Sequence, residues 1–354
     1  MTAARLLART VRGIEPVVAD EIRERGLGDV EHLGHREVWF RHTAPGPAVL
    51  GLRTADDVFL VATTVAGIGR HRADLHGLTR AAAALPLRGL LSARARCAPT
   101  AEPSGVDVSA SFLGRRNYSR YDLEDAVGEP LAAALGLPYH SRRDGAKPPP
   151  GGLSWRVTVT GERAVLALRI GARPLHRRSY RRASRPGSLH PPLASALVRL
   201  AAPPAGARLL DPCCGTGTIP VEAALAGSGL SIVGSDRDPA AVAAAAANGA
   251  GTGVRWVVAD AGALPVPSGA VDVVVSNPPW DRQVPPSGAL AREPGRLYRE
   301  LHRVLRPGGR AVLLVPDAEA AVAEAKAAGF ALRGRRAVSL SGRHPEIVEL
   351  DRRP

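Results

Sequence analysis

The stretch DPCCGTGT, residues 211–218, decides the fold of the C-terminal half of the chain. It follows a strand candidate at 208–210 (Arg-Leu-Leu) and leads into a helical pattern at 219–226, so a strand, a glycine-containing turn and a helix come in succession. Only glycine lets a loop turn this tightly and admit a ligand against its backbone. The stretch therefore predicts the nucleotide-binding crossover of an α/β sheet.

The same alternation of strands and helices continues beyond this turn. The sequence predicts further strands at 231–235, 255–258, 272–276 and 310–315, and an alanine-rich helix at 240–248. Strands and helices that alternate in this way form a parallel, doubly wound sheet. The C-terminal half is therefore predicted to be a Rossmann-like domain.

Three aspartates follow three successive strands of this sheet. Asp211 ends the first strand, and Asp236 ends the second, 19 residues after Gly217. Asp260-Ala261 ends the third. In such crossovers an acid after the second strand binds both hydroxyls of a ribose, and an acid after the third strand can accept from an adenine amino group. The three carboxylates are therefore expected to converge on one crevice that binds the adenosine part of a cofactor.

The same stretch excludes two other ways of binding a nucleotide. A GxGxxG turn for the pyrophosphate of a dinucleotide is absent, and so is a Gly-Lys-Ser/Thr phosphate loop. Cys213 and Cys214 are adjacent, but no CxxC spacing selects them for redox chemistry. We interpret them as small packing residues.

A second motif, Asn277-Pro278-Pro279-Trp280, follows the fourth strand of this sheet and faces the same crevice. An exocyclic amine of a nucleobase is a poor nucleophile, because its lone pair is delocalised into the ring. If the Asn277 side-chain oxygen and the Pro278 carbonyl each accept one N–H, the lone pair is directed at an electrophilic methyl group. The two prolines hold this geometry rigidly, and Trp280 offers a face for an unstacked base.

This motif indicates transfer of a methyl group from S-adenosylmethionine to an amine of a base. A strong general base is not required, because the amine loses its proton readily once it is methylated. Asp281 could relay that proton, although an exposed acid after the motif is the simpler interpretation. A proline-rich turn without function is common after Asn-Pro alone, but not downstream of three aspartates in this order.

The positive charge of the chain lies mainly in its N-terminal half. The net charge is +14; residues 1–190 carry 29 lysines and arginines against 18 acids, whereas residues 191–354 carry 18 against 15. Coding bias explains why 45 of the 47 basic residues are arginine, but not why the surplus lies in one half. A basic half joined to a near-neutral half is expected when one unit holds a polyanion and the other modifies it.

Residues 173–185 are especially rich in arginine and contain no acid. Arginine suits phosphate through its planar fork of donors and can stack on bases, while a tyrosine adds an aromatic face. We interpret this stretch as an RNA-facing linker; the alternative is a solvated hinge. The candidate RNA-binding residues are Arg173, Arg177, Arg178, Tyr180, Arg181, Arg182 and Arg185.

The N-terminal half alternates helices and strands less regularly. The sequence predicts a small α/β module that ends near residue 65, with a helix at 16–25 and a strand at 37–41. Beyond it the sequence predicts one helix at 81–91, a strand at 106–112, a helix at 123–135, a loop at 147–152, and a hairpin of 155–160 with 164–170.

Bulk features argue against a membrane protein, a secreted protein and a metal site. The continuously apolar window at 240–247 is too short to span a bilayer, and the N-terminus lacks the apolar core of a signal peptide. Cys97, Cys213 and Cys214 cannot build a disulfide framework, and no cluster of histidines and cysteines has zinc-ligand spacing. We expect a cytoplasmic protein without a metal ion.

These motifs resemble those of the THUMP-domain RNA guanine-N2 methyltransferases, a family that includes tRNA (guanine-6-N2) enzymes. The resemblance rests on residues 210–218, 277–280 and 180–194, and on Arg12-Gly13-Ile14-Glu15 near the start. The parts that it implies are a ferredoxin-like domain at 1–65, a THUMP RNA-binding domain at 66–172, an arginine-rich linker at 173–190 and a Rossmann-like methyltransferase domain at 191–354.

The resemblance also implies which residues hold the substrates. Asn277 to Trp280 would hold guanine, although Trp280 stands where the family more usually has Tyr or Phe. The THUMP unit of such enzymes grips the single-stranded 3′ end of tRNA, which makes the N2 amine of guanosine 6 in the acceptor stem the expected target. The residues implied to bind S-adenosylmethionine are Asp211, Pro212, Cys213, Gly215, Thr216, Gly217, Asp236, Arg237, Asp260, Ala261, Ser188 and His190.

Three functions stay open. The resemblance favours guanine-N2 methylation of tRNA. The same tetrapeptide also serves adenine N6, so an amine of ribosomal RNA or DNA is an alternative substrate. A protein of another class, which binds RNA through a vestigial methyltransferase fold, is the third, but the intact Asp211, Asp236, Asp260 and Asn277 argue against it. We expect a monomer.

Overall fold

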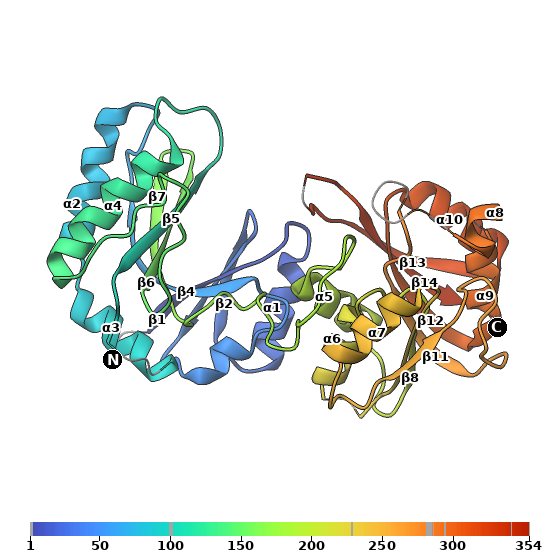
Figure 1. Ribbon diagram of the computed structural model, residues 1–354. Helices are drawn as coiled ribbons and strands as arrows, with labels where there is room; N and C mark the ends of the chain where they lie inside the picture. Colours follow the sequence, from blue (N-terminus) through green and yellow to red (C-terminus); the bar gives the residue numbers. More distant parts are fainter. Residues whose placement is uncertain are drawn as a thin grey trace. The chain divides into compact units, whose positions relative to one another are not determined.

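The computed structural model describes residues 3–98, 102–227, 229–280, 285, 287–293, 295–340 and 342–353 (Figure 1). The chain divides into two compact units. The first comprises Met1–Arg9 and Ala19–Leu175, and the second comprises Thr10–Val18 and His176–Pro354. Within the described residues, no helix is both long enough and apolar enough to span a membrane.

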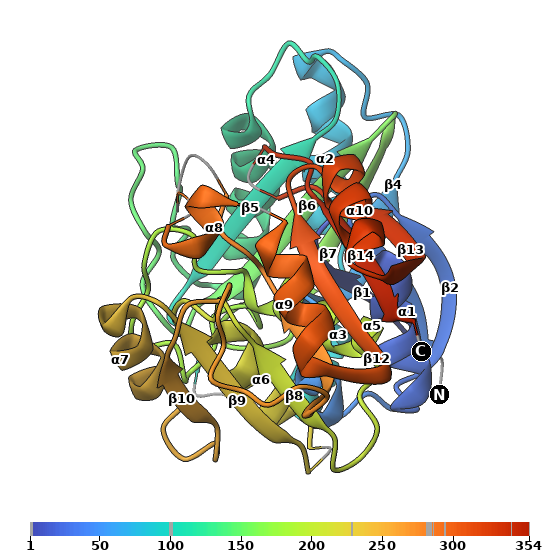
Figure 2. The same cartoon turned by 90° about the vertical axis from the view of Figure 1, so that its right-hand side faces the viewer.

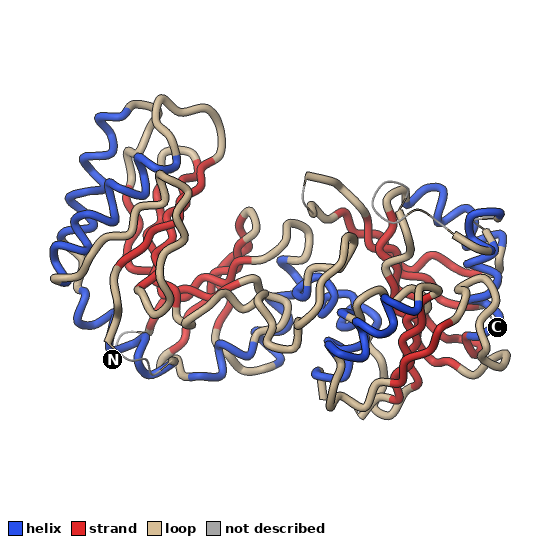
Figure 3. The backbone as a smooth tube through the Cα atoms, in the orientation of Figure 1, coloured by secondary structure: helices blue, strands red, loops and turns tan. Residues whose placement is uncertain are grey.

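The first unit contains a seven-stranded sheet in the order β2-β3-β1-β4-β7-β6-β5 (Figure 3). All neighbouring strands are antiparallel except β5 and β6. Helices α2 and α4 pack on the sheet through Leu78 and Leu123, which share a core cluster with Trp155. The strands are β1 (Ala4–Arg9), β2 (Asp29–Gly34), β3 (Glu37–His42), β4 (Asp57–Val65), β5 (Val106–Phe112), β6 (Leu153–Thr160) and β7 (Arg163–Arg169). The helices are α1 (Glu15–Glu24), within which the division between the units falls, α2 (Leu75–Ala83), α3 (Leu87–Cys97) and α4 (Arg120–Leu135), with 3-10 turns at Pro47–Gly51 and Arg72–Asp74.

The N-terminal predictions succeeded where the pattern was local. The hairpin is confirmed as β6 and β7, which pair directly, and residues 147–152 form a loop. The single helix predicted at 81–91 is wrong: α2 ends before Pro86 and α3 begins after it, because proline has no N–H to donate and disfavours helix in the residue before it. Strands β1 and β2 were not predicted. Because β4 pairs with β7, the two N-terminal domains expected from the sequence share one sheet.

The second unit contains another seven-stranded mixed sheet, in the order β10-β9-β8-β11-β12-β14-β13. The first five strands are parallel, whereas β14 runs antiparallel to both of its neighbours. The strands are β8 (Arg208–Asp211), β9 (Ser231–Asp236), β10 (Arg255–Val258), β11 (Val271–Ser276), β12 (Leu305–Val315), β13 (Phe330–Ala337) and β14 (Glu346–Arg352). The helices are α5 (Pro191–Ala201), α6 (Thr218–Leu225), α7 (Pro239–Asn248), α8 (Ala289–Arg292), α9 (Arg296–Val304) and α10 (Ala318–Ala327).

Helices cover both faces of this second sheet. Leu301 of α9 and Ala325 of α10 belong to one core cluster, and Figure 2 shows these two helices in front of β12. Leu197 of α5 and Ile219 of α6 belong to another cluster. The predicted strands and helices of the parallel part are all present, whereas β13 and β14 were not foreseen. The strand order reverses between β8 and β11, and ligands of such sheets bind where that reversal occurs.

Candidate active site

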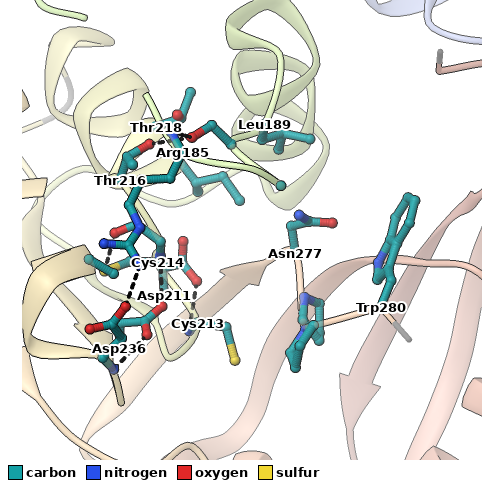
Figure 4. A pocket seen from close by; sticks show the side chains of 18 of the residues that line it. Arg185, Leu189, Asp211, Cys213, Cys214, Thr216, Thr218, Asp236, Asn277 and Trp280 are labelled. Atoms are coloured by element: carbon teal, nitrogen blue, oxygen red, sulfur yellow. Dashed lines mark hydrogen bonds and ion pairs between the residues drawn. The ribbon is translucent and has the colours of Figure 1, made fainter. Parts of the chain in front are cut away.

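A cavity of about 650 Å³ lies in the second unit at the carboxyl ends of the parallel strands. Its volume is in the range of small-molecule sites. Figure 4 shows Asp211 and Asp236 on one side of it, and Asn277 and Trp280 on the other. The predicted residues that line it are Ser188, His190, Asp211, Pro212, Cys213, Gly215, Thr216, Asp236, Arg237, Asp260, Ala261, Asn277, Pro278, Pro279 and Trp280, joined by Arg181 and Arg185 of the linker.

Gly217 was expected to contact the cofactor, but it does not line the cavity. A side chain here would meet Trp256, because a Cβ on Gly217 would lie 2.6 Å from the indole ring. A Cβ added to Gly234 or to Gly249 would likewise lie 2.5 Å from this ring. Gly217 also has a φ of +80°, which L side chains rarely adopt. Its glycine is therefore required by the packing of Trp256 and by the turn.

Asp211 fastens the glycine-containing turn to the strand that carries Asn277. Its Oδ1 accepts hydrogen bonds from the Ser276 hydroxyl at 2.6 Å and the Cys213 backbone N–H at 3.1 Å. The side chain is 1% exposed, and this burial raises the pKa of Asp211 to about 7, although the two hydrogen bonds act to lower it. Asp211 therefore positions the elements on either side of the cavity.

Asp236 and Asp260 are oriented by backbone N–H groups. Asp236 accepts from Gly215 at 2.9 Å through Oδ2 and from Asp238 at 3.0 Å through Oδ1. Asp260 accepts from Gly262 at 2.9 Å and from Ala289 at 3.0 Å. Burial acts to raise the pKa of Asp260, but the two N–H groups and the nearby Arg237 and Arg292 together lower that pKa below its ordinary value. Each carboxylate keeps lone pairs for a ligand, because an ionised carboxylate has about four acceptor sites.

The two adjacent cysteines are free thiols within the cavity wall. Burial is the main reason why the pKa values of Cys213 and Cys214 lie well above the ordinary range, and the nearby Asp211 raises them further. Both thiols are therefore protonated at neutral pH and are poor nucleophiles. This agrees with their interpretation as packing residues.

The two polar side chains of the Asn277–Trp280 motif have buried atoms without partners. Neither the Asn277 Oδ1 nor the Trp280 Nε1 has a hydrogen bond within the described residues. An unsatisfied buried polar atom costs about 1 to 3 kcal/mol, so native proteins rarely leave one without a reason. The Trp280 ring also packs against the core cluster that contains Leu197. Asp281, the candidate proton relay, lies outside the described residues.

Two residues of the arginine-rich linker are held by α6. Arg178 donates from Nε to Glu222 Oε1 at 2.9 Å, and the Tyr180 hydroxyl donates to the same oxygen at 2.7 Å. The side chain of Glu222 is 0% exposed and that of Arg178 is 10% exposed. The sequence predicts that both Arg178 and Tyr180 face RNA. In the structure both donate to Glu222 and join the linker to α6, and their contact with RNA stays a prediction.

Residues 182–185 of the linker are anchored beside the cavity within the second unit. The backbone N–H groups of Arg182 and Ala183 both donate to Asn248 Oδ1 at 2.9 Å. Arg185 pairs with Asp238 at 2.5 Å. The side chains of Arg177 and Arg182 are exposed, and their contact with RNA stays a prediction.

Several residues that line the cavity were missed. Asp238, two residues after Asp236, has an acidic side chain that accepts from Ala240 N–H and begins α7, and the Asp-Pro pair could have indicated it. Leu340 and Arg343 come from the loop between β13 and β14, and no local sequence signal marks them.

Comparisons with known proteins cover both units. A family model described as an RMKL-like methyltransferase domain matches residues 178–346. The chain is 32% identical over 360 residues to tRNA (guanine(6)-N2)-methyltransferase of Thermus thermophilus, covering 98% of this chain and 99% of that protein. It is similar to the crystal structure of TrmN from Thermus thermophilus, with a TM-score of 0.78, 32% identity and 99% coverage of each chain. The Bos taurus tRNA (guanine(6)-N(2))-methyltransferase THUMP3 is 30% identical over 56% of this chain and 42% of its own length.

Proposed function

This chain belongs to the tRNA (guanine(6)-N2)-methyltransferase family, and we propose that it transfers a methyl group from S-adenosylmethionine to the exocyclic N2 amine of a guanosine in tRNA. The observation that carries the chemistry is the buried Asn277 Oδ1, an acceptor without a partner in the described residues. It lines the same cavity as three aspartates that follow three parallel strands.

The residues of the cavity fit S-adenosylmethionine. When bound, this cofactor supplies a methyl group that is activated by a sulfonium. Asp236 would bind the two ribose hydroxyls, because the N–H groups of Gly215 and Asp238 orient its oxygens and leave lone pairs free. Asp260 accepts from the adenine amino group. The main-chain turn around Gly215 would hold the cofactor together with Ser188, whose hydroxyl lies 3.0 Å from the Thr216 hydroxyl of the same turn.

Asn277 and Pro278 orient the amine of the base. One N–H of guanine N2 donates to Asn277 Oδ1, which has no partner among the described residues, and the other donates to the Pro278 carbonyl. This arrangement turns the nitrogen lone pair away from the ring and toward the methyl group, so the rate rises through orientation. The ring of Trp280 stacks on the base, and such a contact contributes roughly 1 to 3 kcal/mol. The proton is released after transfer, because the methylated amine is acidic.

The first unit supplies the RNA-binding surface. We assign a ferredoxin-like domain to residues 1–65 and a THUMP domain to 66–172; together they grip the 3′ end of tRNA and present guanosine 6 of the acceptor stem. The surplus of basic residues in 1–190 supports this assignment, since phosphate contacts dominate RNA affinity. The protein acts as a monomer in the cytoplasm, where its three free cysteines remain reduced.

Methylation assays on separate pools of nucleic acid test this proposal. The purified full chain is incubated with methyl-labelled S-adenosylmethionine and with tRNA, ribosomal RNA or DNA, and the nucleosides are identified by mass spectrometry. We expect N2-methylguanosine in tRNA. Label confined to ribosomal RNA, or to adenine N6 of DNA, would exclude the proposed substrate and support the alternative enzyme.

A modified tRNA tests which nucleotide is methylated. In a tRNA with inosine at position 6, the amine is missing while the rest of the base is unchanged. We expect label to disappear from this tRNA and to persist in one with inosine at a neighbouring position of the stem. A tRNA that lacks its single-stranded 3′ end should bind more weakly than the intact tRNA. Equal methylation of the truncated and the intact tRNA would refute the role assigned to residues 66–172.

A further inference from the structure

The loop between β13 and β14 lies at the end of the cavity that contains Asn277, where the nucleobase is proposed to bind. Three aspartates follow β10, β9 and β8, Asn277 follows β11, and β13 and β14 come last in the strand order. Because β14 is antiparallel to β12 and β13, the loop that joins β13 to β14 lies at the same edge as the carboxyl ends of β8 and β11. Residues of this loop therefore meet the cavity on the side of Asn277 away from the aspartates.

Arg343 is presented to the cavity by a tight turn of this loop. Leu340 and Arg343 exchange two backbone hydrogen bonds of 2.9 Å, which close the turn. Both residues line the cavity. Leu340 also packs against the core cluster that Trp280 contacts, so the turn is held against the wall that carries the catalytic motif.

Arg343 differs from the other arginines that line the cavity. Arg185 is paired with Asp238 at 2.5 Å, and Arg237 lies 3.9 Å from Asp260. Arg181 donates to the Ser184 hydroxyl. The Arg343 guanidinium, in contrast, has no hydrogen bond or ion pair with any residue that the structure describes. The cavity thus carries fixed carboxylates at one end and an unpaired cation at the other.

We propose that Arg343 binds a phosphate that flanks the target guanosine, and thereby positions the nucleotide against Asn277. This inference rests on the proposed function and names a further contact of the same site. A guanidinium presents a fork of donors that matches phosphate oxygens. The aspartates repel a phosphate at the cofactor end, so the cation at the opposite end sets the direction in which the nucleotide enters. Asn277 already provides an acceptor for the base and Trp280 a ring face on which it stacks, so the guanidinium is available for the phosphate of the RNA backbone.

The loop is fixed by the N-terminal segment of the second unit. The Ser339 N–H donates to the Arg12 carbonyl at 3.0 Å, and Val338 packs in the same cluster as Val11. Gly13 has a φ of +102°, and a Cβ there would lie 2.1 Å from the Ala337 carbonyl oxygen. A side chain at Gly13 therefore has to displace the strand end from which the loop begins.

The first test compares Arg343→Gln with the wild-type full chain on tRNA. We expect KM for tRNA to rise roughly tenfold, with kcat and the Kd for S-adenosylmethionine unchanged. The slope of log affinity against log salt should fall by about 0.7 to 0.9. Arg343→Lys should recover part of the loss, because it keeps the charge but not the fork. The matched control is Arg335→Gln, which removes the same charge from an exposed pair with Glu346 on this hairpin and should leave KM unchanged.

The second test identifies the group on the RNA. A tRNA carrying one neutral methylphosphonate beside the target guanosine, on its 5′ or 3′ side, should lose roughly tenfold in kcat/KM with the wild type at one of the two sites. The same substitution should cause no further loss with Arg343→Gln. Replacing the target guanosine by 7-deazaguanosine should change kcat/KM by the same factor for the wild type and for Arg343→Gln, so that the difference between the two proteins persists. If the difference between the proteins vanishes on 7-deazaguanosine instead, Arg343 contacts the base edge and the phosphate assignment is overturned.

A second variant tests the position of the loop without touching Arg343. Gly13→Ala should raise KM for tRNA while the Kd for S-adenosylmethionine stays the same, and it should add nothing to Arg343→Gln. Wild-type KM in both single variants would overturn the inference and leave the proposed function standing. Absence of tRNA methylation by the wild type itself would overturn the proposed function.

Discussion

The linker at 173–190 and the Asn277–Trp280 motif were both expected to contact RNA, yet their buried polar atoms differ. In the linker, Arg178 and Tyr180 share the buried Glu222 as a partner. In the motif, Asn277 Oδ1 and Trp280 Nε1 have no partner within the described residues. Other buried atoms, such as Trp155 Nε1, also lack a partner among the described residues, but Asn277 and Trp280 combine this with a place in the cavity wall, where a ligand can supply the partner. The difference separates a structural contact from a substrate contact where residue type alone did not.

The largest effect is expected from breaking the linker contact. Arg178→Ala leaves the Glu222 carboxylate buried without its cation and should destabilise the second unit by about 3 to 5 kcal/mol. Thermal unfolding of the full chain measures this loss. Arg177→Ala removes an exposed neighbouring arginine and should change stability by less than about 0.5 kcal/mol. Equal unfolding temperatures for the two variants would contradict a structural role for Arg178.

Asn277→Ala should show the opposite pattern. Methyl transfer should fall by roughly a hundredfold or more, because the acceptor that orients the amine is lost. The unfolding temperature should not fall, since the lost amide oxygen has no partner in the part of the chain that the structure describes. Asn248→Ala is the matched control: its amide bonds to Arg182, Ala183 and Thr216, so this variant should be destabilised. Retained turnover in Asn277→Ala would refute the mechanism.

Asp211 is a third kind of buried polar group. It has hydrogen-bond partners, as Glu222 does, but its burial still disfavours the ionised carboxylate. Its pKa of about 7 lies above that of the unfolded chain, so the folded state binds the extra proton and loses stability as the pH rises toward 7. Between pH 5.5 and pH 8 the loss should be about 2 kcal/mol. Asp211→Asn can still accept from Ser276 and Cys213 and should flatten this dependence in unfolding experiments. A wild-type slope that persists in Asp211→Asn would assign the titration to another group.

Asp272 provides a control of opposite sign. Hydrogen bonds from Arg208 come first among the causes that lower the pKa of Asp272 to about 2. Its stabilisation is therefore present at neutral pH and is lost as the pH falls below about 4 toward 2. Asp272→Asn should weaken the chain at pH 7 and leave the slope between pH 5.5 and pH 8 unchanged.

The smallest effects are expected from the exposed arginines of the linker. Arg177→Gln and Arg182→Gln should each lower the slope of log affinity for tRNA against log salt by about 0.7 to 0.9, with little change in kcat. Filter binding at several salt concentrations measures this slope. Slopes identical to that of the wild type would remove these side chains from the RNA-binding surface.

Much of the second unit could be predicted because its signals are local. Asp211, Asp236 and Asn277 each follow a short run that predicts a strand. They could therefore be recognised from their neighbours in the sequence, without reference to distant contacts. The break at Pro86 was also readable in principle, since proline acts on its immediate neighbours. The sequence could not show that Gly217 is needed to make room for Trp256, because Trp256 lies 39 positions further along the chain.

The sequence by itself determined the reaction class, the parallel sheet and the position of the carboxylates, because each follows from residues adjacent in the chain. Tertiary structure alone decided which polar groups are satisfied. It paired Arg178 with Glu222, left Asn277 Oδ1 without a partner among the described residues, and brought Arg343 into the cavity wall through a loop that contacts Arg12 and Gly13. Hydrogen bonding and burial depend on residues that meet only after folding, so no local pattern records them.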